Sequence, residues 1–196
     1  MSIEIRCKCG SIRGKAISVS GSNAGRFICY CNDCQAFANY LSSSKSTLDA
    51  HGGTEITPFY PAQIQITHGA DQLRCLRLSP KGLYRWYAGC CRTPIANSNP
   101  GLPWAGMIHT ALVGDREKEL GPIRGGLFGK FAIGTPPSGT PDKVGLRELL
   151  MIAPFMVKGF ILGRKSPSPF YDSKTGAPIA VPKVLTKEER FSKEGL

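Results

Sequence analysis

The sequence has few acidic residues and few histidines, and it has no long hydrophobic run. Its 196 residues include 14 Asp and Glu against 25 Lys and Arg, and only 3 His. No uncharged apolar run approaches the roughly 18 residues of a membrane-spanning helix, so we expect no membrane span. The sequence contains neither G-x-x-x-x-G-K-[ST] nor G-x-G-x-x-G. These absences argue against a P-loop nucleotide-binding fold and against a dinucleotide-binding fold.

Residues 1–14 lack the apolar core and the small-residue cleavage site of a secretory signal peptide. We therefore expect a cytoplasmic protein in a reducing compartment. Cysteines stay reduced there, and they serve metal or redox chemistry more often than disulfide frameworks.

The formal net charge is +11, which by itself is compatible with nucleic acid, an anionic membrane or an acidic substrate. The basic residues are spread through both halves of the chain, and the longest cluster is only Gly163-Arg164-Lys165. An excess spread this evenly is usually solvated surface. We expect nucleic-acid binding to be weak at most, and electrostatic in origin.

Carboxylates are scarce before residue 100. Those present are Glu4, Asp33, Asp49, Glu55 and Asp71. No paired carboxylates and no Ser-His-Asp order stand out, so acid–base catalysis without a metal is not expected.

Cysteine, by contrast, is concentrated. Seven of the eight cysteines fall into three tight groups. These are Cys7-Lys8-Cys9, Cys29-Tyr30-Cys31-Asn32-Asp33-Cys34 and Cys90-Cys91. Thiolates one to three residues apart on a turn can converge on one zinc ion about 2.3 Å away. We predict zinc as the cofactor and all seven cysteines as metal ligands.

The two larger groups differ in kind. The first is a C-x-C-G knuckle in which Gly10 supplies the tight backbone. The second, C-x-C-x-x-C, offers three thiolates within six residues. Three protein ligands leave one position open on a tetrahedral zinc, as catalytic sites do. Cys29, Cys31 and Cys34 are therefore the candidate catalytic residues.

Other candidate ligands are weaker. Cys75 lies in the middle of an expected strand, where a lone cysteine is usually a small buried hydrophobe. His51 follows the second group and could complete or flank its metal, although a histidine in a surface loop is the commoner interpretation. His68 and His109 read as a turn residue and a strand residue.

Short alternating runs separated by turn residues predict a mainly β protein of antiparallel hairpins. A turn is expected at Gly21-Ser22-Asn23, and Gln35–Leu41 predicts a short helix. The expected strands are 3–5, 12–19, 26–29, 64–67, 73–78 and 83–87, with 107–113 and 127–133 further on.

A longer helix is predicted from Thr140-Pro141-Asp142, which reads as a capped helix start, toward Leu162, with Pro154 kinking or dividing it. Its broad apolar face has three candidate partners. We rank a sheet of the same chain first, a partner chain, as in a homodimer, second, and a membrane surface third. We expect residues 1–100 to form a zinc-binding β domain. Residues 101–196, a Gly/Pro-rich extension with helix and extended tail, are expected to pack on it as one structural unit and to cover the zinc pocket.

Three motifs together carry a family resemblance. They are Cys7-Lys8-Cys9-Gly10, the C-x-C-x-x-C from Cys29 to Cys34, and Arg85-Trp86-Tyr87-Ala88-Gly89-Cys90-Cys91-Arg92-Thr93-Pro94-Ile95. Over residues 3–97 the sequence resembles the glutathione-dependent formaldehyde-activating enzyme and centromere protein V family. The resemblance implies an antiparallel β-tent fold. It also implies a structural zinc held by the first and last groups, and a second zinc on the middle group that meets glutathione and its formaldehyde adduct.

The sequence departs from the family pattern in the last motif. When Cys91-Arg92-Thr93-Pro94 is placed on the family's C-G-[ST]-P, Ala88 stands where another cysteine is expected, and Arg92 replaces glycine. Either Cys90 and Cys91 both bind the first metal, or that site has only Cys7, Cys9 and Cys91 with water. Adjacent side chains normally point apart, yet a structural site with three thiolates is less favourable, and we favour ligation by both.

Two functions remain open from the sequence. In the first, the protein is a zinc-dependent carbon–sulfur lyase in which Cys29, Cys31 and Cys34 present the metal to a small thiol or a thiol adduct of a small carbonyl. The candidates for receiving substrate carboxylates are Arg26, Arg85, Arg92 and Arg124. In the second, it is a non-catalytic, zinc-stabilised scaffold that binds a protein or nucleic-acid partner.

Overall fold

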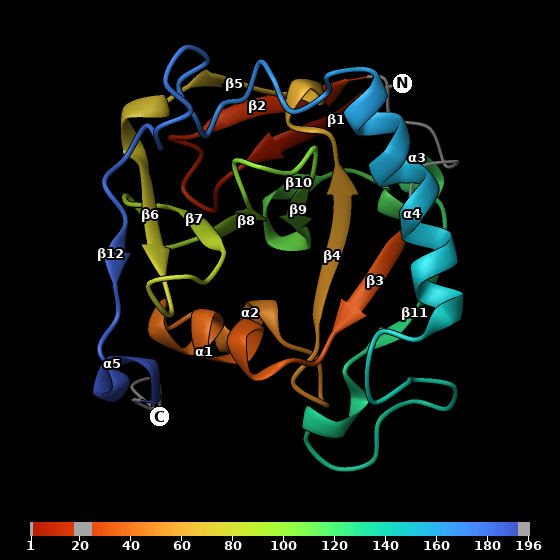
Figure 1. Cartoon of the computed structure of the whole chain (residues 1–196). Helices are drawn as coiled ribbons and strands as arrows, with labels where there is room; N and C mark the ends of the chain where they lie inside the picture. Colours follow the sequence, from red (N-terminus) through yellow and green to blue (C-terminus); the bar gives the residue numbers. More distant parts are fainter. Residues whose placement is uncertain (1, 18–24, 192–196) are drawn as a thin grey trace.

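A computed structural model describes residues 2–17 and 25–191 and shows a mainly β protein with two sheets (Figure 1). The smaller sheet has the order β10-β1-β2-β5 and the larger one β11-β3-β4-β9-β8-β7-β6-β12. The strands of the smaller sheet are β1 (Ser2–Arg6), β2 (Arg13–Ile17), β5 (Ile64–His68) and β10 (Leu112–Val113). The strands of the larger sheet are, in sequence order, β3 (Arg26–Cys29), β4 (Thr54–Phe59), β6 (Leu73–Arg77), β7 (Tyr84–Ala88), β8 (Pro94–Ser98), β9 (Ala105–Ile108), β11 (Ile123–Leu127) and β12 (Lys183–Val184).

The prediction of a mainly β fold with a C-terminal helix is confirmed. Strand pairing is antiparallel except at the two edges of the larger sheet, where β11 pairs with β3 and β12 with β6 in parallel. Both edge strands come from the chain after residue 100. Long connections carry them back to the sheet, and such connections permit parallel pairing where hairpins do not.

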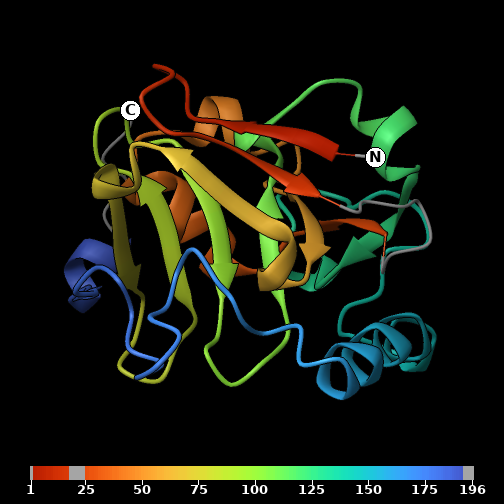
Figure 2. The ribbon, with the colours of Figure 1, turned by 90° about the horizontal axis from the view of Figure 1, so that it is seen from above.

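The helices lie at the margins of the sheets (Figure 1). They are α1 (Asn32–Tyr40), α2 (Ser44–Thr47), α3 (Arg116–Leu120), α4 (Leu146–Ile161) and α5 (Lys187–Phe191). Seen from above, β1, β2 and β5 cross over the strands of the larger sheet, and α4 stands at one corner (Figure 2). None of the helices in the described ranges is long and apolar enough to cross a membrane.

Most expected strands between β3 and β7 are present within about two residues, and β3 has the predicted bounds. The strand expected at 127–133 is wrong. Phe128 takes a left-handed φ of 62°, which ends β11 and starts a 3₁₀ turn at Gly129–Phe131. The expected continuation to Val19 and the turn at Gly21-Ser22-Asn23 lie outside the described residues.

The longer helix begins later than predicted. α4 starts after Gly145, whose N–H donates to Glu148 Oε2 at 2.9 Å. The expected helix start, Thr140-Pro141-Asp142, lies before α4 and contacts another segment instead. The Gly129 N–H donates to the carbonyl of Pro141 at 2.8 Å. The helix runs undivided through Pro154, so of the two effects expected there, kinking or division, division is wrong.

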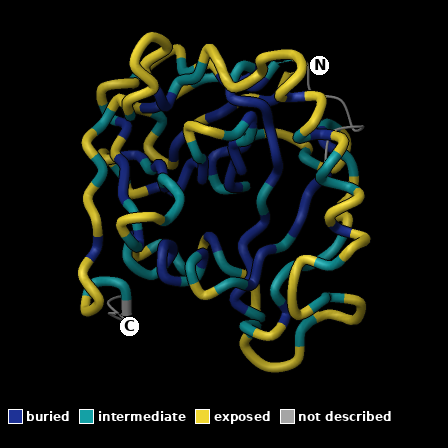
Figure 3. Tube along the Cα trace, in the orientation of Figure 1, coloured by how far each residue is buried: buried dark blue, intermediate teal, exposed yellow. Residues whose placement is uncertain are grey.

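The core lies between the two sheets, where the central strands are buried (Figure 3). Trp86 of β7 is fully buried and stacks on Phe170, with ring centroids 5.1 Å apart. Tyr171 also packs on Trp86 and shares a hydrogen bond of 2.7 Å with Ser98. The tail after α4 therefore supplies side chains to the core of the β sheets.

One face of α4 is attached to the β structure through Tyr60, which directly follows β4. The rings of Tyr60 and Phe155 stack at 4.1 Å, and Tyr60 Oη donates to the Phe155 carbonyl at 2.8 Å. A Cβ on Gly159 would come within 2.6 Å of Tyr60, so only glycine fits this close contact. The opposite face of α4 is exposed (Figure 3).

Candidate metal centres

The first cysteine group forms a four-thiol cluster. The sulfurs of Cys7, Cys9, Cys90 and Cys91 all lie within 4.8 Å of one another, a spacing at which they could hold one metal ion. The Cys9–Cys90 separation is 3.3 Å and the Cys7–Cys9 separation 3.6 Å. The cluster joins the turn after β1 to the turn after β7.

The backbone around Cys7 is arranged as in a metal knuckle. The Gly10 N–H donates to the Cys7 carbonyl at 2.9 Å, with Gly10 at a φ of 79°. The Ile12 N–H donates to Cys7 Sγ at 3.2 Å. Such N–H donors stabilise a thiolate, the form of cysteine that binds metal. A hydrogen bond with Ser11 lowers the pKa of Cys9 to about 6.

Adjacent Cys90 and Cys91 both reach this cluster because of an unusual turn. Arg92 takes a left-handed φ of 56°, the conformation that glycine favours, while its N–H donates to the Ala88 carbonyl at 2.8 Å. Thr93 Oγ1 accepts from the Lys8 N–H at 3.0 Å and ties the two turns together. In this turn both cysteines are close enough to the other two to be ligands of one metal ion.

The second group forms a three-thiol cluster where β3 ends and α1 begins. The sulfurs of Cys29, Cys31 and Cys34 lie within 4.8 Å of one another, and Cys29 Sγ and Cys31 Sγ are 3.3 Å apart. Cys31 is the N-cap of α1, and the Cys34 N–H donates to its carbonyl at 3.0 Å. The positive end of the α1 dipole thus faces the sulfurs and favours their ionised form.

The pKa values of the three thiols differ. Hydrogen bonds from Cys29 and then from Cys34 lower the pKa of Cys31 to about 2. The bond to Cys31 raises the pKa of Cys29. For Cys34, the hydrogen bond with Cys29 lowers the pKa, but the bond with Cys31 and complete burial outweigh it and raise the pKa to about 12. Of the three thiols, Cys31 is therefore the one whose ionised form is favoured, and it is less buried than Cys29 and Cys34.

The three-thiol cluster lies in the wall of a cavity of about 690 Å³. The remaining wall is mostly apolar and comes from β3, β4, the connection between β8 and β9, the end of β11 with its following turn, and α4. Ile152 and Met156 of α4 and Trp104 of the connection are among these side chains. The C-terminal third of the chain thus contributes part of the cavity wall, through Phe131, Ile152, Met156 and Arg190.

Polar side chains beside the cysteines form one connected network. Arg85 is buried and donates to Asn97 Oδ1 at 3.1 Å and to Asp33 Oδ2 at 3.5 Å. Arg190 of α5 donates to Asp33 Oδ1. The positive charge of Arg85 also contributes to lowering the pKa of Cys31. No sequence motif assigns a role at this site to Asp33, Asn97 or Arg190, because nothing in their local sequence shows that they meet.

Of the four arginines expected to receive substrate carboxylates, only Arg85 lines the cavity. Arg26 is buried in an ion pair with Glu55 at 2.8 Å, and Arg92 donates to the carbonyl of Tyr40. Arg124 lies against Gly25, at the start of β3. The structure does not support a substrate role for these three.

The remaining candidate ligands lie outside both clusters. Cys75 is buried in β6, as expected for a core residue, and its burial raises the pKa to about 12. His51 Nδ1 lies 3.2 Å from the Ile133 carbonyl, and His51 is in neither cluster. His68 Nδ1 contacts Thr67 Oγ1 at 3.1 Å.

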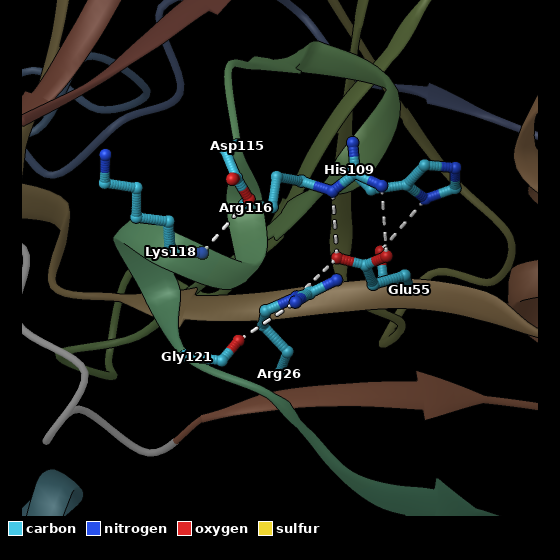
Figure 4. Close-up of polar contacts among 7 residues, drawn as sticks. All are labelled: Arg26, Glu55, His109, Asp115, Arg116, Lys118 and Gly121. Carbon is cyan, nitrogen blue, oxygen red and sulfur yellow. Dashed lines mark hydrogen bonds and ion pairs between the residues drawn. The ribbon is translucent and has the colours of Figure 1, made fainter.

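Glu55 forms a separate buried charge cluster on β4 (Figure 4). It accepts hydrogen bonds from Arg26 at 2.8 Å and Arg116 at 3.2 Å, while Arg26 also donates to the Gly121 carbonyl. Burial raises the pKa of Glu55, but the bond from Arg26 and the charge of Arg116 outweigh it and lower the pKa overall. The His109 ring faces the Glu55 carbonyl at 3.4 Å, and burial lowers the pKa of His109. This cluster joins β3, β4 and α3, and we interpret it as structural.

Comparisons with known proteins place the sequence in a family. No curated protein matches it. A crystal structure of a Rhodobacter sphaeroides protein is similar over 64% of this chain and 99% of that chain, with 16% sequence identity and a TM-score of 0.45. Residues 1–182 match the family described as "Family of unknown function (DUF6151)". The chain therefore belongs to this family.

Proposed function

We propose that the protein is a zinc-dependent enzyme whose reaction centre is the Cys29-Cys31-Cys34 cluster, and that the Cys7-Cys9-Cys90-Cys91 cluster holds a structural zinc. One observation carries the proposal. The three-thiol cluster includes no fourth histidine, cysteine or carboxylate ligand from the described ranges, and it lies in the wall of a cavity large enough for a small-molecule substrate.

The four-thiol cluster has the composition of a closed structural site, and it joins two distant turns. A zinc ion on the three-thiol cluster would supply Lewis acidity and hold a substrate sulfur as thiolate. This division of roles is the one that the resemblance to formaldehyde-activating enzymes implies.

The proposed reaction is the reversible cleavage of a thiol adduct of a small carbonyl. In the direction of cleavage, the carbon–sulfur bond of a hemithioacetal breaks and its electron pair remains on sulfur. The hydroxyl oxygen loses its proton and becomes the carbonyl oxygen, and the sulfur takes up one proton as it leaves, so the products are a thiol and an aldehyde. No oxidant or reductant is required. This is carbon–sulfur lyase chemistry.

Within this proposal, the chain's own residues bind and orient the adduct. Arg85 places its guanidinium at the cysteine end of the cavity, where Asn97 and Asp33 hold it in position. A fixed cation there stabilises negative charge that develops on the substrate oxygen. The apolar walls exclude water, which strengthens that interaction.

The test is aldehyde–hemithioacetal exchange followed by NMR saturation transfer, with formaldehyde and either glutathione or hexane-1-thiol. Using two thiols of different polarity distinguishes two failures: the protein does not accept one particular thiol, or it does not catalyse this reaction at all. The expected result is faster exchange with the zinc-loaded protein for at least one thiol, falling to the buffer rate in Cys31→Ser. Exchange at the buffer rate with both thiols would contradict the proposed lyase activity.

A further inference from the structure

The walls of the cavity differ sharply from its cysteine end. Phe27 and Ile56 project from neighbouring strands, Trp104 from the β8–β9 connection, and Ile152 and Met156 from α4. Among the described residues that line the cavity, the charged side chains are Asp33, Arg85 and Arg190, and hydrogen bonds join them. The cavity is thus apolar along its walls and polar at one end.

This distribution does not suit a hydrophilic peptide such as glutathione, the thiol that the family resemblance implies. Glutathione carries two carboxylates and an ammonium group. The two arginines in the cavity wall both contact Asp33, Arg85 at 3.5 Å, and among the described residues they are the only cations that line the cavity, which leaves no cation along the apolar walls for a second carboxylate. Placing further charges against Trp104, Ile152 or Met156 would remove their hydration without replacing it, which is costly.

We propose that the cavity selects an apolar thiol, or the adduct of an apolar thiol with a small carbonyl, in preference to glutathione. This inference rests on the proposed function, because the substrate sulfur is placed at the Cys29-Cys31-Cys34 zinc. The hydrocarbon portion lies along α4 and the β8–β9 connection. A volume of about 690 Å³ is within the range of pockets that enclose most of a drug-sized molecule.

The test uses the full chain with cobalt(II) in place of zinc, because thiolate binding to cobalt gives a charge-transfer absorption. Ethanethiol, butane-1-thiol, hexane-1-thiol and glutathione are titrated separately. Burial of each methylene should tighten binding about fourfold, so hexane-1-thiol should bind roughly 10²-fold more tightly than ethanethiol. Glutathione should bind no better than ethanethiol.

Two adjacent residues of α4 supply a matched pair of variants. Met156 lines the cavity, whereas Val157 faces away and is 56% exposed. Met156→Gln should weaken hexane-1-thiol binding severalfold and leave ethanethiol nearly unchanged. Val157→Gln should leave the whole series unchanged. Equal thermal unfolding of the two variants shows that neither effect comes from misfolding.

The outcomes separate this inference from the proposed function. If thiols perturb the cobalt spectrum but glutathione binds as tightly as hexane-1-thiol, the inference of an apolar substrate is wrong and the proposed metal centre stands. If no thiol changes the spectrum, the proposed function fails, and the substrate inference falls with it. A graded increase with chain length that is lost in Met156→Gln supports both.

A second inference comes from the outer face of α4. Leu146 and Ile161, at the two ends of the helix, are 72% and 77% exposed. Between and beside them lie further exposed apolar side chains: Leu149, Leu150, Val157, Phe160 and Leu162. An exposed apolar surface of this extent usually marks an interaction site.

The charges around this face are mainly basic. Lys143, Arg147 and Lys158 are exposed, as are Arg164 and Lys165 just after the helix. The one acid within α4, Glu148, is buried and bonded to the Gly145 N–H. Exposed apolar side chains flanked by Lys and Arg are typical of helices that lie in the surface of an anionic membrane.

We propose that the outer face of α4, defined by Leu146, Leu149, Leu150, Val157, Phe160 and Ile161, docks on an anionic lipid surface. Charge complementarity selects this occupant, because a second copy of the face would bring like charges together. The proposal is independent of the metal centres. The inner face of the same helix remains packed on Tyr60.

The test is co-sedimentation with vesicles of pure phosphatidylcholine or with one quarter phosphatidylglycerol. The expected result is binding to the anionic vesicles, weakened roughly tenfold by Ile161→Asp and by higher salt. Val181→Asp, at an apolar residue that is 93% exposed but outside α4, is the control and should bind as the wild type. Failure to sediment with anionic vesicles would overturn the proposal. The proposal would also be overturned if light scattering showed a homodimer that Ile161→Asp dissociates.

Discussion

Arg190 in α5 donates a hydrogen bond to Asp33 in α1, although the two residues are 157 positions apart. Asp33 immediately precedes Cys34, so this contact holds the last helix against the three-thiol cluster. Arg190 also lines the cavity. The end of the described chain therefore takes part in closing the candidate site.

The first prediction tests that closure. Arg190→Ala should leave the fold intact but raise the rate at which a chelator removes the zinc of the three-thiol cluster, by about two- to fivefold, because a partly exposed ion pair contributes little free energy. Zinc release is measured with a colorimetric chelator. Lys187→Ala in the same helix is the control, since Lys187 does not line the cavity. Equal release from both variants would show that Arg190 does not restrict access.

The second prediction concerns the unequal roles of the two clusters. Cys9→Ser should lower the melting temperature by about 10 °C or more, because binding of the proposed zinc at the four-thiol cluster should be coupled to folding. Cys31→Ser should lower it much less, since serine is a favourable N-cap for α1. Elemental analysis should find one zinc ion lost in each variant, and equal melting losses would show that both sites are structural.

The third prediction concerns pH and the buried Glu55 cluster. Arg26 and Arg116 lower the pKa of Glu55 in the folded protein, so this group stabilises the fold above its unfolded pKa of about 4.5 and loses that contribution as the pH falls through the folded pKa. At pH 7, Glu55→Gln should cost about 3 kcal/mol, because it leaves Arg26 buried without its charged partner.

Urea unfolding measured from pH 7 to pH 3 checks this expectation. The difference between wild type and Glu55→Gln should shrink as the pH falls below about 4.5. The control is Glu4→Gln, which removes an exposed pair with Arg6 and should cost less than about 1 kcal/mol. A difference that does not change with pH would contradict the assigned pKa direction.

The fourth prediction separates steric from conformational effects at two glycines. Gly69 and Gly134 have nearly equal positive φ values, 68° and 70°. A Cβ on Gly69 would lie 2.2 Å from the Ser11 carbonyl oxygen, whereas a Cβ on Gly134 meets nothing within 4 Å. Gly134→Ala should cost about 1–2 kcal/mol for the left-handed backbone alone. Gly69→Ala should cost a further roughly 1–3 kcal/mol, measured by urea unfolding. Equal losses would contradict the contact at Ser11.

Local sequence patterns predicted β1, in which side chains alternate, and also β3, in which three of the four residues are buried. In β1 every second residue is buried, Ile3 and Ile5, and the strand expected at residues 3–5 lies within one residue of β1 at each end. β4 and β8 were not predicted. Both are almost wholly buried interior strands of the larger sheet, so they lack alternation, and each contains a proline, Pro58 or Pro94.

The sequence by itself determined which residues can bind metal, because thiolates that converge on one ion must be close together in the chain or on adjoining turns. Only the tertiary structure shows the left-handed turn at Arg92 that brings Cys90 and Cys91 to one cluster. The tertiary structure alone decided what the three-thiol cluster faces. Its cavity is made by residues as distant as Phe27, Trp104 and Met156, and no local pattern specifies contacts between segments so far apart.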